Sequence, residues 1–139
     1  MRILPPVWSM SRTAVQEDEI DGYRIPVGSN LFISPYVTHR RADLWPDPEK
    51  FIPERFASGQ RDRHPRYAFF PFGGGRHTCL GEPFVRMEAL MILAAIQQFF
   101  ELKIVPGFEV VPQAVVTLRP RDGIRVTLEP REIPLGRNR

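Results

Sequence analysis

The stretch FFPFGGGRHTCLGEPF, Phe69 to Phe84, holds the only cysteine of the chain, Cys79. Three consecutive glycines, Gly73 to Gly75, precede it and give the loop backbone conformations that other residues avoid. A helix-forming apolar run follows it, and a helix start carries a partial positive charge that stabilises a thiolate. Gly81, two positions after the cysteine, leaves no side chain where a flat ligand would approach. These features indicate a loop that presents one reactive sulfur.

Several roles are open to a lone cysteine at this position. A buried structural cysteine is the commonest, although a glycine run is not typical of a packing role. Zinc takes about four ligands, and the sequence offers one cysteine with three dispersed histidines, His39, His64 and His77. A cysteine nucleophile needs a histidine base, and His77 is too close in sequence to judge. A phosphate loop would continue with Gly-Lys-Ser/Thr, which is absent. The last role is an axial thiolate ligand of haem iron.

The pattern after the cysteine predicts one long helix over residues 82–99. Pro83 falls within its first turn, where the missing amide costs nothing. Residues 89–96 are apolar on all sides, so the helix is expected to be largely buried. This longest apolar run is far too short to span a bilayer.

The segment before the cysteine loop predicts short strands and an irregular meander. Residues 3–12 read as an extended entry segment. Tyr23–Ile25 and Asn30–Ser34 read as a hairpin-like pair of strands near turns at Gly22 and at residues 26–28. A proline every few residues makes residues 45–71 an ordered but irregular segment, which is usually functional or a packing lid.

Two further patterns complete the list of expected elements. Ser34 is placed to cap a short helix that has Pro35 at its first position. After the long helix, three alternating segments bounded by proline or glycine predict short strands within residues 100–107, 114–120 and 123–130.

Composition excludes several classes of protein. The 139 residues indicate one domain spanning 1–139. A net charge of +3 is too weak to argue for nucleic acid, so the basic runs at 61–66 and 137–139 are interpreted as solvated loop and tail. One cysteine excludes an intramolecular disulfide and favours a reducing compartment. No secretory signal is visible, so the expected location is cytoplasmic.

Three motifs together resemble the cytochrome P-450 family. FGGGRHTCLG is similar to its haem-binding loop, WPDPEKFIPERF to its meander, and RILPP to the end of its Glu-x-x-Arg helix and the segment after it. The run from Cys79 onward is similar to the helix that leaves the haem ligand. The resemblance implies an α+β chain, the C-terminal part of a mainly helical fold, with short strands, a meander, a haem-binding loop, one long buried helix and C-terminal strands.

The resemblance also implies site residues. Cys79 matches the axial ligand of the haem b iron and so the catalytic position. Phe72, Gly75 and Gly81 match loop positions around it. His77 and Arg12 match residues that hold the haem propionates by charge-assisted bonds.

Two arginines are expected to have a structural role. Arg2 matches the arginine of Glu-x-x-Arg, and Arg55 matches the arginine of the meander. In the family both share a buried glutamate, which has no counterpart here because the sequence begins one residue before Arg2. The two arginines are therefore expected to form an uncompensated pair of like charges.

The expected function is haem-thiolate monooxygenation of a small apolar substrate. Electrons would come from a ferredoxin or a flavoprotein reductase, and neither nucleic acid nor a membrane segment is expected. The region that supplies the distal wall and the substrate pocket in the family is missing, so the chain is interpreted as a C-terminal fragment that is inactive in isolation. The alternative is a non-catalytic remnant that binds haem weakly or not at all.

Overall fold

The computed structural model describes residues 1–60 and 63–131. The chain divides into two compact units, each described here by itself. The first unit contains Met1–Gly74 and Ala114–Leu118, and the second contains Gly75–Gln113 and the chain from Arg119 onward. Of the basic runs, 137–139 and the first two residues of 61–66 lie outside the described residues.

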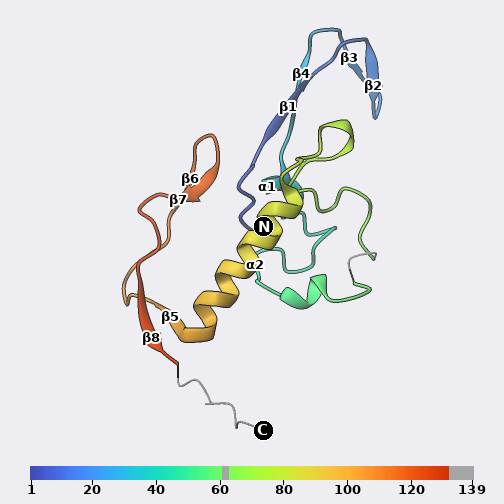
Figure 1. The fold of residues 1–139 in the computed structure, drawn as a ribbon. Helices are drawn as coiled ribbons and strands as arrows, with labels where there is room; N and C mark the ends of the chain where they lie inside the picture. The colour runs from blue at the N-terminus through green and yellow to red at the C-terminus, as the bar shows by residue number, and fades with distance from the viewer. Residues whose placement is uncertain (61–62, 132–139) are drawn as a thin grey trace. The chain divides into compact units, whose positions relative to one another are not determined.

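Two antiparallel strand pairs lie in the first unit (Figure 1). β1 (Met10–Thr13) pairs with β4 (Asn30–Ile33). β2 (Asp18–Ile20) pairs with β3 (Tyr23–Ile25). The strand expected at Tyr23–Ile25 is therefore confirmed, and the strand expected at Asn30–Ser34 is present but ends at Ile33. The expectation that these two strands pair with each other is wrong.

Turn geometry explains this pairing. Asp21 and Gly22 both have positive φ, 51° and 80°, which is the geometry of the two-residue turns that join strands directly. That turn connects β2 to β3, so β3 pairs with β2, and β4 pairs instead with β1 in the entry segment. Hydrogen bonds between residues 14 and 28–29 continue the β1–β4 pair at its end, so part of the segment expected only to be extended is a strand.

A short helix, α1 (Pro35–Thr38), follows β4. The Ser34 side chain accepts a hydrogen bond from the Val37 amide, so the predicted cap is confirmed. His39 ends the helix as its C-cap, and its amide donates to the Pro35 carbonyl at 2.8 Å. The helix thereby fixes the backbone from which the His39 side chain projects.

The core of the first unit lies in the meander, which contains the 3₁₀ helix η1 (Pro53–Phe56). Trp45 has no exposed surface, and Ala68 is also buried. Two polar residues, Arg2 and His39, are buried with them. The irregular segment predicted over 45–71 is thus ordered by packing around one indole ring.

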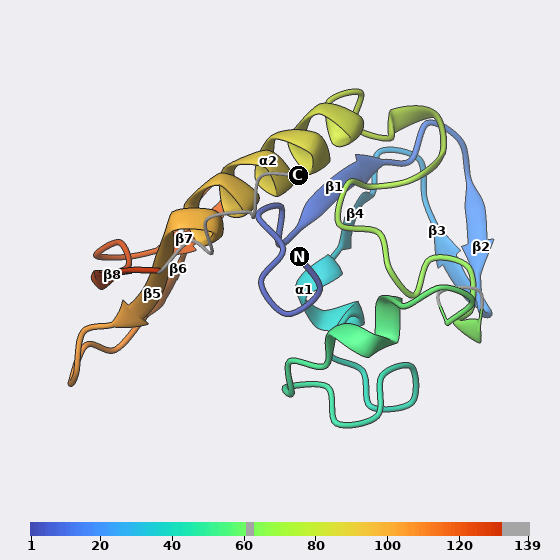
Figure 2. The same ribbon diagram turned by 60° about the horizontal axis from the view of Figure 1, so that its bottom comes forward.

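The second unit contains the long helix and a strand pair. A 3₁₀ helix, η3 (Gly75–His77), leads to α2 (Glu82–Phe99), whose predicted bounds are confirmed. β5 (Phe100–Ile104) continues from α2 and pairs antiparallel with β8 (Val126–Pro130) (Figure 2). Two more strands, β6 (Pro112–Ala114) and β7 (Leu118–Pro120), pair with each other.

Helix α2 differs from expectation in its surroundings. No residue of it is buried, and apolar side chains along it, such as Leu90 at 70% and Met91 at 64%, are exposed. The described residues therefore do not supply the neighbours that an all-apolar helix needs. Across the described parts of the chain, no helix combines the length and hydropathy needed to cross a membrane.

Candidate functional site

The first half of the cysteine loop lies in the first unit. The Gly73 amide donates to the Phe70 carbonyl at 3.0 Å, which closes a turn with Gly73 at a φ of 79°. Gly74 is required for a different reason, since a Cβ there would lie 2.6 Å from Cε1 of Tyr67. A side chain is therefore disfavoured at position 73 by the backbone conformation and at position 74 by the Tyr67 ring.

The second half of the loop lies in the second unit. Gly75 has a φ of 70° and begins η3. The amide of Thr78 donates to the Gly75 carbonyl at 3.2 Å, and the Thr78 hydroxyl donates to the same oxygen at 2.9 Å. The Glu82 amide donates to the Cys79 carbonyl at 3.4 Å. These bonds hold the cysteine between the 3₁₀ turn and the start of α2.

Cys79 is a free and exposed thiol. A side chain at Gly81 would touch its sulfur, because a Cβ there would lie 3.7 Å from Sγ. With glycine at that position, this side of the sulfur is left open. The exposure of Cys79 shows that a buried structural role is wrong in this chain.

Other readings of the cysteine find little support in the geometry. In the described residues, no three side chains of His, Cys, Asp or Glu gather as a metal site would require. His77 is exposed on η3 and makes no hydrogen bond to Cys79 within this described loop. A zinc centre and a cysteine–histidine pair are thus both disfavoured.

The start of α2 favours negative charge beside the loop. Gly81 is the N-cap and provides no side-chain cap, so the helix start keeps its partial positive charge. Glu82 in the first turn is neutralised by an ion pair with Arg86 at 2.8 Å. The helix dipole is therefore not opposed by an unpaired carboxylate next to the cysteine.

The predicted propionate ligands lie in different units. Arg12 is half-buried on β1 opposite Leu31, and its Nη1 donates to the Ser11 carbonyl at 2.7 Å. Phe72 lies in the first unit with it, whereas Gly75, His77 and Cys79 belong to the second. Joint contact of Arg12 and His77 with one ligand stays a prediction.

Arg2 and Arg55 interact within the first unit. Arg2 donates to the carbonyls of His39, at 2.7 Å, and Lys50, at 3.0 Å. Burial lowers the pKa of Arg2, and the positive charge of Arg55 lowers it further. Nε of Arg55 is buried without a hydrogen-bond partner. An anion beside these guanidinium groups would satisfy that atom, and the role of a glutamate there stays a prediction.

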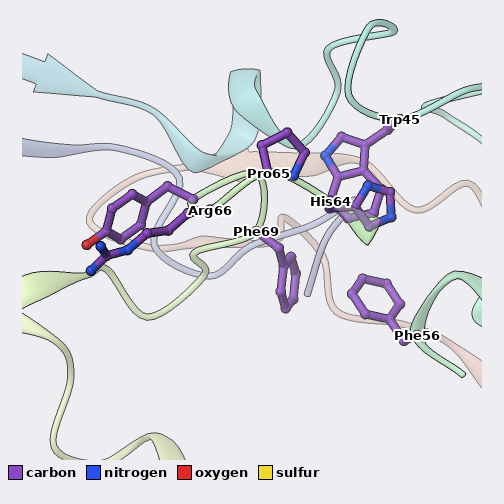
Figure 3. Close-up of a pocket in the computed structure, with 7 residues that line it drawn as sticks. Trp45, Phe56, His64, Pro65, Arg66 and Phe69 are labelled. Carbon is purple, nitrogen blue, oxygen red and sulfur yellow. The ribbon is translucent and has the colours of Figure 1, made fainter. Parts of the chain in front are cut away.

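An aromatic pocket of about 340 Å³ lies in the meander of the first unit. Figure 3 shows His64 lying over Trp45, with Phe56 and Phe69 beside them, and the two stacked rings have centroids 4.0 Å apart. Arg66 and Tyr67 also line it. None of the predicted cofactor-binding residues lines this pocket, so it is not the site that the cysteine loop indicates.

Sequence reasoning missed Tyr67, His39 and Trp45 as parts of the loop's support. Tyr67 is a non-glycine residue with a φ of 65°, and its ring packs against Gly74. The side chains of His39 and Trp45 bond the backbone of residues 68–70. Trp45 and Tyr67 lie in the proline-rich segment 45–71 and His39 lies just before it, but nothing in the sequence marked these residues as partners.

Comparison with known proteins gives consistent matches. The family model described as Cytochrome P-450 matches residues 1–127. A protein of Mycobacterium tuberculosis named "Putative cytochrome P-450 132" is 42% identical over 125 residues, which are 90% of this chain and 27% of that protein. Cyclooctatin synthase of Streptomyces melanosporofaciens is 36% identical over 131 residues, 94% of this chain and 28% of that protein.

Solved structures give the same result. The structure described as retinoic acid bound cyanobacterial CYP120A1 is similar at a TM-score of 0.86 and 37% identity, over 93% of this chain and 30% of that one. A cytochrome P-450 haem domain is similar at a TM-score of 0.88 and 28% identity, over 94% of this chain and 29% of that one. The predicted fold class is confirmed. The chain spans less than a third of the length of these relatives.

Proposed function

This chain belongs to the cytochrome P-450 family, and on that premise we propose that its cysteine loop binds haem b with Cys79 as the axial ligand of the iron. The observation that carries the proposal is the exposed Cys79 sulfur, left open on one side because Gly81 has no side chain. The porphyrin supplies its own four nitrogen ligands, so one protein thiolate is a sufficient donor set. The residues present therefore fit the group.

The proposed activity is monooxygenation as part of a longer enzyme. A haem iron with a thiolate ligand favours cleavage of the O–O bond of dioxygen, which allows one oxygen atom to enter an apolar substrate. Cys79 supplies the thiolate, and the amides and partial charge at the start of α2 stabilise its negative charge. In this proposal His77 and Arg12 would each hold a propionate of the bound haem by a charge-assisted bond.

The substrate class and electron donor are proposals of the same kind. The proposal of a small apolar substrate is supported by the similar solved structure described as bound to retinoic acid, which is a largely hydrocarbon molecule. Electrons would come from a ferredoxin or a flavoprotein reductase, as is general in the family.

A second candidate is a non-catalytic remnant that binds haem weakly or not at all. One observation favours it, namely that α2 has no buried residue. Haem needs apolar cover on both faces, and a loop beside an uncovered helix offers little of it.

Loading the purified chain with haem, reducing it and adding carbon monoxide tests the proposal. We expect the red-shifted Soret band that a thiolate ligand gives, and we expect Cys79→Ala to abolish it, because no second cysteine is present. Thr78→Ala is the matched control and should keep the band. A band unchanged by Cys79→Ala would refute the ligand assignment, and a parent chain that takes up no haem would favour the remnant.

The propionate assignment predicts faster haem loss. Replacing His77 or Arg12 with alanine removes a charge-assisted hydrogen bond worth about 1.5–3 kcal/mol, so haem transfer to an apo-globin acceptor should accelerate about tenfold to a hundredfold. Arg76→Ala removes a neighbouring exposed positive charge and serves as the control, with little change expected. Equal loss rates in the variants and the parent would contradict the role of these residues.

A further inference from the structure

Two fully buried side chains bond the backbone of the segment that enters the cysteine loop. Nε1 of Trp45 donates to the Ala68 carbonyl at 3.2 Å. The Phe70 amide donates to Nε2 of His39 at 3.0 Å. Neither Trp45 nor His39 has any exposed surface, so the bond to Ala68 is buried and the bond from Phe70 is partly buried.

These bonds complete the hydrogen bonding of residues 68 and 70. The Ala68 amide donates to the Pro65 carbonyl at 3.0 Å, and the Phe70 carbonyl accepts from Gly73 at 3.0 Å. The segment belongs to no strand. The Ala68 carbonyl and the Phe70 amide therefore have no neighbouring strand with which to form hydrogen bonds. Because buried backbone groups need partners, the indole and the imidazole act in place of a neighbouring strand.

The imidazole fits this task only when it is neutral. Nε2 accepts a hydrogen bond, so it carries no hydrogen, and the hydrogen of the neutral ring is on Nδ1. Burial lowers the pKa of His39 to about 4, which keeps the ring neutral near pH 7. The ring centroids of Phe69 and Phe70 lie 5.1 and 5.3 Å from the centroid of the imidazole, and these contacts fix the orientation of the His39 ring.

We infer that His39 and Trp45 are positioning residues that fix the segment Ala68–Phe70 and thereby the approach of the chain to the cysteine loop. The bonded residues come just before the turn at Gly73, and Phe70 lies nine positions before Cys79. The consequence for haem rests on the proposed function, because a loop that is free to shift presents the sulfur and Phe72 less consistently to the ring. The bonds themselves do not depend on haem.

Substitutions at His39 separate the bond from the packing. His39→Leu fills a similar volume with an apolar side chain but removes the hydrogen-bond acceptor. His39→Gln keeps an acceptor, because its amide oxygen can reach the Phe70 amide as Nε2 does. Amide hydrogen exchange, followed by NMR on the haem-free chain, should accelerate about tenfold at Phe70 in His39→Leu and stay near the parent rate in His39→Gln. The Gly28 amide, bonded to the Ala14 carbonyl at 2.8 Å in the same unit, is the internal control.

The haem-loaded chain supplies a second measurement. With carbon monoxide bound, His39→Leu and Trp45→Phe should lose at least half of the thiolate-type Soret band to a shorter-wavelength band, and His39→Gln should restore it. An unchanged Phe70 exchange rate in His39→Leu, a lack of protection at Phe70 in the parent, or equal acceleration at Gly28 would each overturn the inference. If the parent shows Phe70 protection but no thiolate band, the proposed haem function fails while the positioning bonds stand.

Discussion

Replacing Trp45 with alanine is expected to lower the free energy of unfolding by about 3–5 kcal/mol. The indole is fully buried and contacts His64, with ring centroids 4.0 Å apart. Arg2 lies 5.3 Å from the ring centre. Alanine at this position would leave a large cavity and would also leave the Ala68 carbonyl without its buried partner.

Trp8 provides a matched control for this prediction. Its indole also donates to a backbone carbonyl, that of Val115 at 3.1 Å, but its side chain is only half-buried. Urea unfolding followed by circular dichroism should show a clearly smaller loss for Trp8→Ala than for Trp45→Ala. Equal losses would mean that Trp45 is not the centre of the core.

Acidification from pH 6.5 to 4 is expected to destabilise the fold by about 3 kcal/mol through His39. The pKa of His39 is lowered to about 4, mainly by burial and to a smaller extent by the positive charges of Arg2 and Arg40. An unfolded histidine has a pKa near 6.5, so between these values the unfolded state binds more protons. Stability therefore falls as the pH falls through this window, and His39 adds no further loss below about pH 4.

The pH dependence has a direct check. Urea midpoints measured at several pH values should show this slope in the parent chain and in His77→Gln, which changes an exposed histidine. His39→Gln should lose the part of the slope between pH 4 and 6.5. If His39→Gln keeps the full slope, another group is responsible for it.

Local features of the sequence predicted local structure well. The Ser34 cap and the bounds of α2 both follow from chemistry within a few residues of each element. The strand pairing was wrong because Asp21 and Gly22 form a tight turn, and that turn leaves β4 to a strand some twenty residues away.

Long-range contacts were the part that the sequence did not reveal. The bond from Phe70 to His39 joins residues 31 positions apart, and the bond from Trp45 to Ala68 joins residues 23 apart. No periodicity or spacing marks such pairs. The burial of α2 was inferred from its own residues, but burial depends on neighbours, and the described chain does not provide them.

The close contact between Tyr67 and Gly74 makes these two positions epistatic. Gly74 does not have the positive φ of its two glycine neighbours, so the obstacle to alanine there is the Tyr67 ring, 2.6 Å from the position of a Cβ. A smaller residue at position 67 would remove that obstacle. Substitutions at the two sites should therefore be non-additive, and the order in which they arise would decide which sequences remain accessible to the loop during evolution.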